Sequence, residues 1–114
     1  MPPPRPISEL VPDRTRVGEC TDRAHCVVAG RVVDVQTELV DGIPVLRAVL
    51  DDAGDRLTLV WESREQIPGV KVGAYVRAEG TVSCRPGGAG GPASRTIVEP
   101  GYTILNAARV EEGT

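Results

Sequence analysis

The sequence predicts an all-β fold, a closed five-stranded Greek-key barrel with a short helical connector between strands three and four. Three observations lead to it. The 114 residues are enough for one domain. Seventeen Val and no Phe make an apolar inventory suited to pleated, half-buried strands. Segments rich in β formers are separated by turns that contain Gly, Asp and Pro.

The chain begins with a segment that we expect to be an extended N-terminal arm. Residues 1–20 hold five of the ten prolines and show neither helical nor strand periodicity. The barrel is expected to span residues 21–106, followed by a flexible acidic tail at 107–114. At most three side chains of the arm are expected to pack on the barrel: Ile7, Leu10 and Val11.

The first predicted strand is long enough to serve two neighbours. Residues 26–39 are nearly all β formers and are interrupted by Gly30. A lone glycine in a strand marks a bulge or a barrel corner, so we expect the strand to bend there. Asp41-Gly42 then predicts a tight turn.

A hairpin is expected next, from residues 44–50 and 56–61 around a turn at Asp51 to Gly54. Its alternation predicts one inward face on each strand. The residues expected to point inward are Leu46, Ala48, Leu50, Leu57, Leu59 and Trp61.

The second half of the chain predicts a connector and two more strands. Ser63 to Ile67 is long enough for one helical turn, ended by Pro68-Gly69. Residues 74–84 form the fourth strand, with a second bend at Gly80. The Gly- and Pro-rich residues from Arg85 to Ser94 predict a mobile loop. The fifth strand, residues 95–105, is interrupted by Pro100-Gly101.

A family resemblance rests on the motifs of this half. Asp52-Ala53-Gly54 precedes Leu57 to Trp61, Pro68 to Gly73 precedes the fourth strand, and Glu99 to Ile104 closes the fifth. Through these motifs, residues 17 to 105 resemble OB-fold domains of the RecG wedge and tRNA-anticodon-binding type, and short stand-alone bacterial OB-fold proteins that bind nucleic acid.

The resemblance implies a small binding module, not an enzyme, that binds single-stranded or junction nucleic acid, DNA or RNA, weakly and without sequence preference. OB folds hold such ligands on the outer face of strands two and three, where Arg side chains can contact phosphates. Relatives often carry several Arg after the third strand, whereas this chain has acidic Glu62 and Glu65 there. The expected contact residues are Arg31, Arg47, Arg56, Thr58, Lys71, Arg77, Arg85 and Arg95.

Base stacking has few candidates, because only Trp61, Tyr75 and Tyr102 are aromatic. Trp61 shares its strand face with Leu57 and Leu59, so we expect it in the core or at the barrel rim.

A second hypothesis is a protein-interaction or regulatory barrel that docks a partner on an exposed strand edge or on the Pro-rich arm. The formal net charge of -3 and a pI near 5.1 favour it, because the long-range field does not attract polyanions. No motif brings an acid, a base and a nucleophile together. Without a signal peptide or an apolar span, we expect a cytoplasmic protein.

Four side chains are able to ligate a metal: Cys20, His25, Cys26 and Cys84. Five residues separate Cys20 from Cys26, which does not match the closely spaced cysteine pairs of zinc sites. An odd number of cysteines without a secretory signal indicates free, reduced thiols. We therefore expect structural thiols, no metal and no other cofactor.

Overall fold

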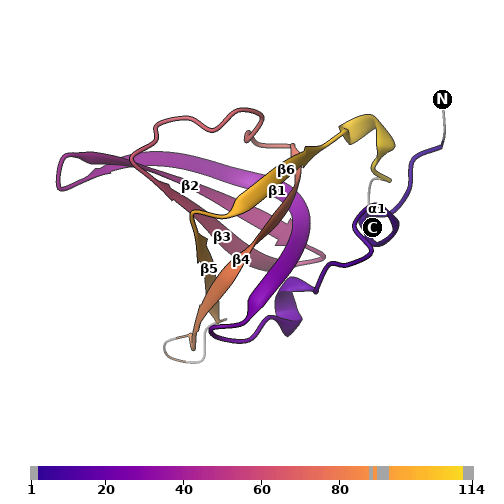
Figure 1. Ribbon diagram of the computed structural model, residues 1–114, viewed down its shortest axis with the longest axis horizontal. Helices are drawn as coiled ribbons and strands as arrows, with labels where there is room; N and C mark the ends of the chain where they lie inside the picture. The colour runs from indigo at the N-terminus through magenta and orange to yellow at the C-terminus, as the bar shows by residue number, and fades with distance from the viewer. Residues whose placement is uncertain (1–2, 88, 90–92, 112–114) are drawn as a thin grey trace.

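The computed structural model describes residues 3–87, 89 and 93–111. Six strands form one sheet in this part of the chain: β1 His25–Val40, β2 Ile43–Asp52, β3 Asp55–Glu62, β4 Tyr75–Arg85, β5 Ser94–Val98 and β6 Gly101–Leu105. Their order is β1-β2-β3-β5-β4-β6, and an additional β1–β4 pairing closes the sheet into a ring (Figure 1). The predicted barrel is confirmed.

β5 and β6 are two halves of the predicted fifth strand. Both pair antiparallel with β4, and the break between them falls at Glu99, with φ 51°, and the buried Pro100. Proline has no N–H for a strand ladder, so the break at this position has a local cause. β5 also pairs in parallel with β3, which joins the β1-β2-β3 part of the sheet to β4 through β5.

Both predicted glycines stand where a strand changes its neighbours, and β1 also has a register shift between Val32 and Asp34, just beyond Gly30. β1 pairs with β4 up to Arg31 and with β2 from Arg31 onward. A Cβ on Gly30 would lie 2.6 Å from the carbonyl oxygen of Asp51, and one on Gly80 would lie 2.6 Å from Cγ2 of Ile97. At each corner the missing side chain lets the neighbouring strand approach closely.

Two-residue turns connect β1 to β2 and β2 to β3, as predicted. Asp41 and Gly42 have φ of 52° and 79°, and Ala53 and Gly54 have φ of 52° and 97°. Two successive positive φ angles are the mark of the type I′ hairpin turn, whose twist matches that of the strands.

The barrel interior is filled by aliphatic side chains from every strand except β6. All six residues predicted to point inward are at most 3 % exposed. They pack with Val28, Val32, Val76, Val82 and Ile97, all fully buried.

The connector between β3 and β4 differs from the prediction, because residues 63–74 contain turns and no helix. Ser63 adopts a left-handed φ of 61°, which is incompatible with a right-handed helix starting there. Five residues are also too few to repay helix nucleation. Ile67, only 5 % exposed, packs into the core and fixes the connector instead.

The arm packs on the barrel more extensively than predicted. It contains α1, Ile7–Leu10, and the 3-10 turn η1, Val17–Glu19. Val11, Val17 and Cys20 are buried, and the last two belong to the main core. The Asp52 carboxylate accepts a hydrogen bond from the Val17 N–H at 3.0 Å and pairs with Arg14 at 3.3 Å.

The C-terminal residues up to 111 lie against the arm, so this part does not form the free tail that the sequence suggested. The 3-10 turn η3, Ala107–Arg109, leads to Val110, which is 4 % exposed and forms a parallel bridge with Arg5. Residues 112–114 lie outside the described residues, as do residues 88 and 90–92 of the predicted mobile loop.

Candidate nucleic-acid interface

The outer wall formed by β1, β2, β3 and β5 has a defined row of charged side chains at one end. Arg31 of β1 lies opposite Asp51 of β2, which lies opposite Arg56 of β3. Directly opposed residues of antiparallel strands project from the same face. The strand spacing places Arg31 and Arg56 about 10 Å apart, one strand on each side of Asp51.

The row continues past β3. Thr58 lies beside Thr96 of β5, so Arg56 and Ser94, two residues earlier on each strand, stand at the same level. Ser94 in turn pairs with Arg85 of β4. Arg31, Arg56 and Arg85, here called the arginine row, therefore stand at one level of the sheet, about 20 Å from end to end along its curved surface, which turns around the barrel from β1 to β4.

The charges of the arginine row are only partly neutralised. Arg56 pairs with Asp51 at 3.7 Å, and its side chain is 67 % exposed. Arg31 and Arg85 are exposed and make no ion pair with any described residue. The row thus holds three guanidinium groups and one carboxylate, while Asp52 and Glu111 line the cavity beside Arg31 together with Arg14.

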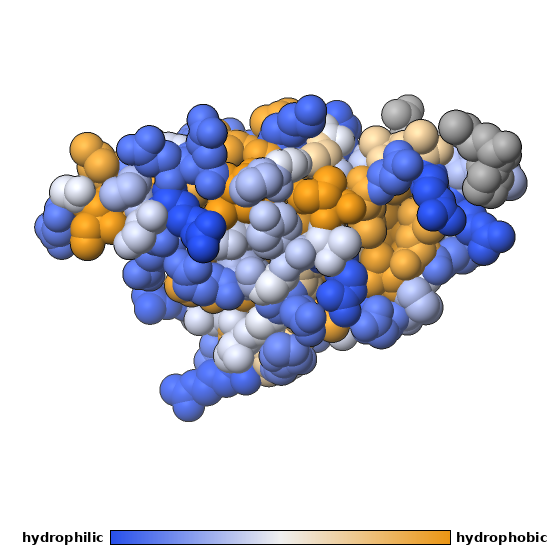
Figure 2. Space-filling view, turned by 45° about the horizontal axis from the view of Figure 1, so that its top comes forward, coloured by the Kyte–Doolittle hydropathy of each residue, from blue (hydrophilic) through white to orange (hydrophobic). Residues whose placement is uncertain are grey.

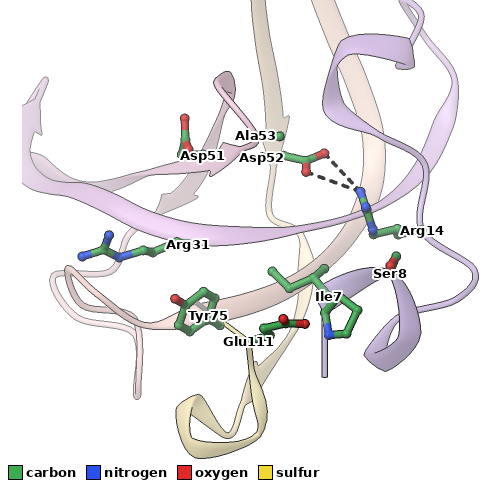
Figure 3. A pocket seen from close by; sticks show the side chains of 10 residues that line it. Ile7, Ser8, Arg14, Arg31, Asp51, Asp52, Ala53, Tyr75 and Glu111 are labelled. Atoms are coloured by element: carbon green, nitrogen blue, oxygen red, sulfur yellow. Dashed lines mark hydrogen bonds and ion pairs between the residues drawn. The ribbon is translucent and has the colours of Figure 1, made fainter. Parts of the chain in front are cut away.

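A cavity of about 260 Å³ opens at the Arg31 end of the row. Tyr75, the β4 partner of Arg31, lines it together with Asp51, Ile7 and Ser8. Figure 3 shows Arg31 and Tyr75 on one side of this cavity, with the arm on the other. The half-buried Tyr75 ring is thus the aromatic group next to the arginine row.

Arg47 and Thr58, also predicted to contact nucleic acid, share the outer wall but lie away from the row. Arg47 stands opposite Val60 and forms an ion pair with Glu38. Thr58 lies between Val49 and Thr96 and is half-buried. With Arg85 at the β4 end of the row, the outer surface therefore joins five predicted contact residues: Arg31, Arg47, Arg56, Thr58 and Arg85.

Three other predicted contact residues lie elsewhere. Arg77 bonds to Asp13 of the arm at 3.2 Å and to Glu79 at 3.4 Å, and the hydrogen bond to Asp13 raises the pKa of its guanidinium. Arg95 donates a hydrogen bond to the Gly18 carbonyl of the arm at 3.3 Å. Lys71 is exposed on the connector.

The predicted metal-capable residues are not gathered. Cys20 and Cys26 are buried, whereas His25 is exposed beside Glu79, at 3.4 Å. No group of three or more potential ligands occurs among the residues that the structure describes. Burial, then the hydrogen bond with Cys26, raises the pKa of the Cys20 thiol to about 12, which makes it a weak metal ligand.

Trp61 and Tyr102 are occupied within the fold. Trp61 is 3 % exposed and meets the Tyr102 ring edge to face, with ring centroids 5.6 Å apart. The prediction that Trp61 belongs to the core is confirmed. Tyr102 is partly buried against the same core, so Trp61 is closed to a base and the Tyr102 ring already has a partner within the fold.

Comparison with known proteins agrees with this architecture. The family described as "OB-fold nucleic acid binding domain", of the tRNA anticodon-binding type, matches residues 26–105. The chain belongs to this family. The match covers this OB-fold domain from the buried half of β1 to the end of β6.

A solved structure gives independent support for the OB fold. RecG, solved bound to a three-way DNA junction, superposes with a TM-score of 0.61 at 21 % sequence identity. The match covers 90 % of this chain and 16 % of the RecG chain. At this identity the likeness establishes the fold, because OB folds serve many functions.

None of the curated proteins matches the sequence. No helix among the described residues is long and apolar enough to cross a membrane.

Proposed function

We propose that this OB-fold domain binds single-stranded or junction nucleic acid weakly and without strong sequence preference, with the phosphates following the arginine row. The observation that carries the proposal is the register that aligns Arg31, Arg56 and Arg85 across five strands. Guanidinium groups along this row can contact phosphates of an extended strand without reading its bases.

Tyr75 supplies the stacking surface of this proposed site. Its ring lines the cavity at the end of the row, beside Arg31. A single stacked base contributes roughly 1–3 kcal/mol. One accessible ring and three phosphate contacts predict dissociation constants in the range of about 10⁻⁴ to 10⁻⁶ M.

The other predicted contact residues enter the proposal in a lesser role. Thr58 is the next residue after Arg56 on the outer face of β3, and its hydroxyl can donate a hydrogen bond. Arg47, Arg77 and Arg95 already bond within the fold, and Lys71 lies on the connector. We therefore assign the main contacts to the arginine row, in a module that binds and does not catalyse.

Fluorescence titration of a labelled single-stranded oligonucleotide at several salt concentrations tests the proposal. Three phosphate contacts predict a slope of log K against log salt of about -2. Arg31→Glu and Arg56→Glu should weaken binding and make the slope shallower by about 0.7 each. Arg64→Glu is the matched control, because Arg64 is exposed on the connector, beyond the opposite end of β3.

Two results would reject the proposal. One is the absence of binding at low salt. The other is an equal loss of affinity in Arg64→Glu and in the row variants, which would indicate attraction by overall charge. In either case the domain would be assigned to partner binding, the second hypothesis that the sequence supports.

A further inference from the structure

The other end of the outer wall carries an apolar stripe. Val40 pairs with Ile43 at the tip of the β1–β2 hairpin, Val45 follows on the same face of β2, and Val60 and Val98 stand side by side on β3 and β5. These five residues are here called the aliphatic stripe. Val40 and Ile43, side by side at the hairpin tip, are 43 % and 47 % exposed, and Val98 at the other end of the stripe is 50 % exposed, whereas Val45 between them is 7 % exposed.

Four residues of the aliphatic stripe line a groove. Val40, Ile43, Val45 and Val60 line a groove of about 280 Å³ together with Asp41, Arg47 and Glu62. The β1–β2 hairpin projects beyond the barrel in Figure 1, and Figure 2 shows apolar side chains at its tip, at the left of the view. The groove therefore lies where the hairpin leaves the barrel and is accessible to another molecule.

Acidic side chains border the groove. Glu38, Asp41, Glu62 and Glu99 are all exposed, and the Glu99 carboxylate accepts a hydrogen bond from the Glu62 N–H at 2.6 Å. Arg47 is the one cation among the described lining residues, and its charge is matched by Glu38. The groove thus repels phosphates, and it disfavours a second copy of this acidic chain.

We propose that this groove binds a protein partner through an amphipathic helix that has an apolar face flanked by Lys or Arg. The stripe runs about 13 Å along β2 and about 10 Å across to β5, so it is about 16 Å long. A helix of roughly 11 residues, three turns, covers that length. Its apolar side chains fill the groove while its cations meet the acidic border. This surface is separate from the arginine row.

The test uses a synthetic, fluorescein-labelled helical peptide of about 14 residues, with Leu at i, i+4, i+7 and i+11 and Lys beside them. Fluorescence anisotropy should show saturable binding, weakened at least about tenfold by Ile43→Asp and by Val98→Asp. Val72→Asp is the matched control, since Val72 is 61 % exposed on the connector, and it should bind like the parent domain. Circular dichroism checks that each variant is folded.

Amide chemical shifts of the unmodified domain provide a measurement that needs no variant. The peptide should shift the amides of Val40, Ile43, Val60 and Val98 and leave those of the arginine row unchanged. Equal binding of a peptide with the same composition but shuffled Leu positions would overturn the proposal, as would binding of a Glu-for-Lys peptide. If the parent domain sediments as a dimer and Ile43→Asp dissociates that dimer, the stripe binds a second copy of the chain and the proposal is wrong. The absence of peptide binding would also reject the proposal.

Discussion

Replacing Gly30 by alanine tests the bend that lets β1 serve two neighbours. The new Cβ would lie 2.6 Å from the Asp51 carbonyl oxygen and 3.1 Å from its carbon, both backbone atoms of β2. Ordinary contact requires about 0.8 Å more, which a rigid strand can provide only by moving away. Overpacking of this kind costs about 1–3 kcal/mol, and each ladder hydrogen bond lost by the shift adds about 1 kcal/mol.

We therefore expect Gly30→Ala to lower the free energy of unfolding by about 2–4 kcal/mol, measured by urea denaturation followed by Trp61 fluorescence. Gly101→Ala is the control in the same barrel, because its Cβ would meet Glu79 at an ordinary 3.5 Å. That change should be neutral or stabilise the domain by up to about 1 kcal/mol through the unfolded state. Equal effects of the two substitutions would refute the close approach of β1 and β2.

Three further predictions follow from single contacts. Asp52→Ala leaves the Val17 N–H without its acceptor and Arg14 without its carboxylate. The substitution should destabilise the domain by about 2–4 kcal/mol and speed hydrogen exchange at the Val17 amide. An unchanged exchange rate at Val17 would contradict this prediction. The pKa of Cys20 is about 12 against an ordinary 9.0, so its thiol stays protonated in the folded domain. The free energy of unfolding, relative to that of Cys20→Ser, should therefore fall as pH rises from 9 toward 12, because only the unfolded thiol ionises there. A pH-independent difference between the two proteins would argue against burial. Tyr75→Ala should weaken oligonucleotide binding by roughly 1–3 kcal/mol while leaving its salt slope unchanged, and unaltered affinity would exclude Tyr75 from the site.

Local patterns predicted most of the fold because each has a local physical cause. Gly30 and Gly80 stand where a side chain would collide with a neighbour, and Asp41-Gly42 supplies the positive φ angles of a tight turn. The connector was predicted incorrectly because the left-handed Ser63 and the burial of Ile67 depend on tertiary packing. No sequence period indicates such an anchor.

The site was less predictable because charge pairing depends on register. All three members of the arginine row are among the contact residues predicted from the sequence. The sequence does not show, however, that the pairing of β5 with β3 and β4 places Arg85 level with Arg56. The ion pair between Arg47 and Glu38 could have been predicted from the sequence. The two-residue turn at Asp41-Gly42 fixes the hairpin register, which brings these two side chains to adjacent positions.

Arg77 and Arg95 could not be placed from the sequence, because their partners lie far away in the chain. Asp13 and Gly18 belong to the arm, which the sequence predicts to be extended and which instead covers part of the barrel. A period-2 pattern identifies the outward side of a strand, but it does not show that another segment covers it.

The central claim is that nucleic acid lies along the arginine row, and amide chemical-shift mapping with a short single-stranded oligonucleotide tests it most directly. We expect the shifts to be concentrated at Arg31, Arg56, Tyr75 and Arg85, while the amides of the aliphatic stripe stay in place. Shifts centred on Val60 and Val98, or no shifts at low salt, would contradict it.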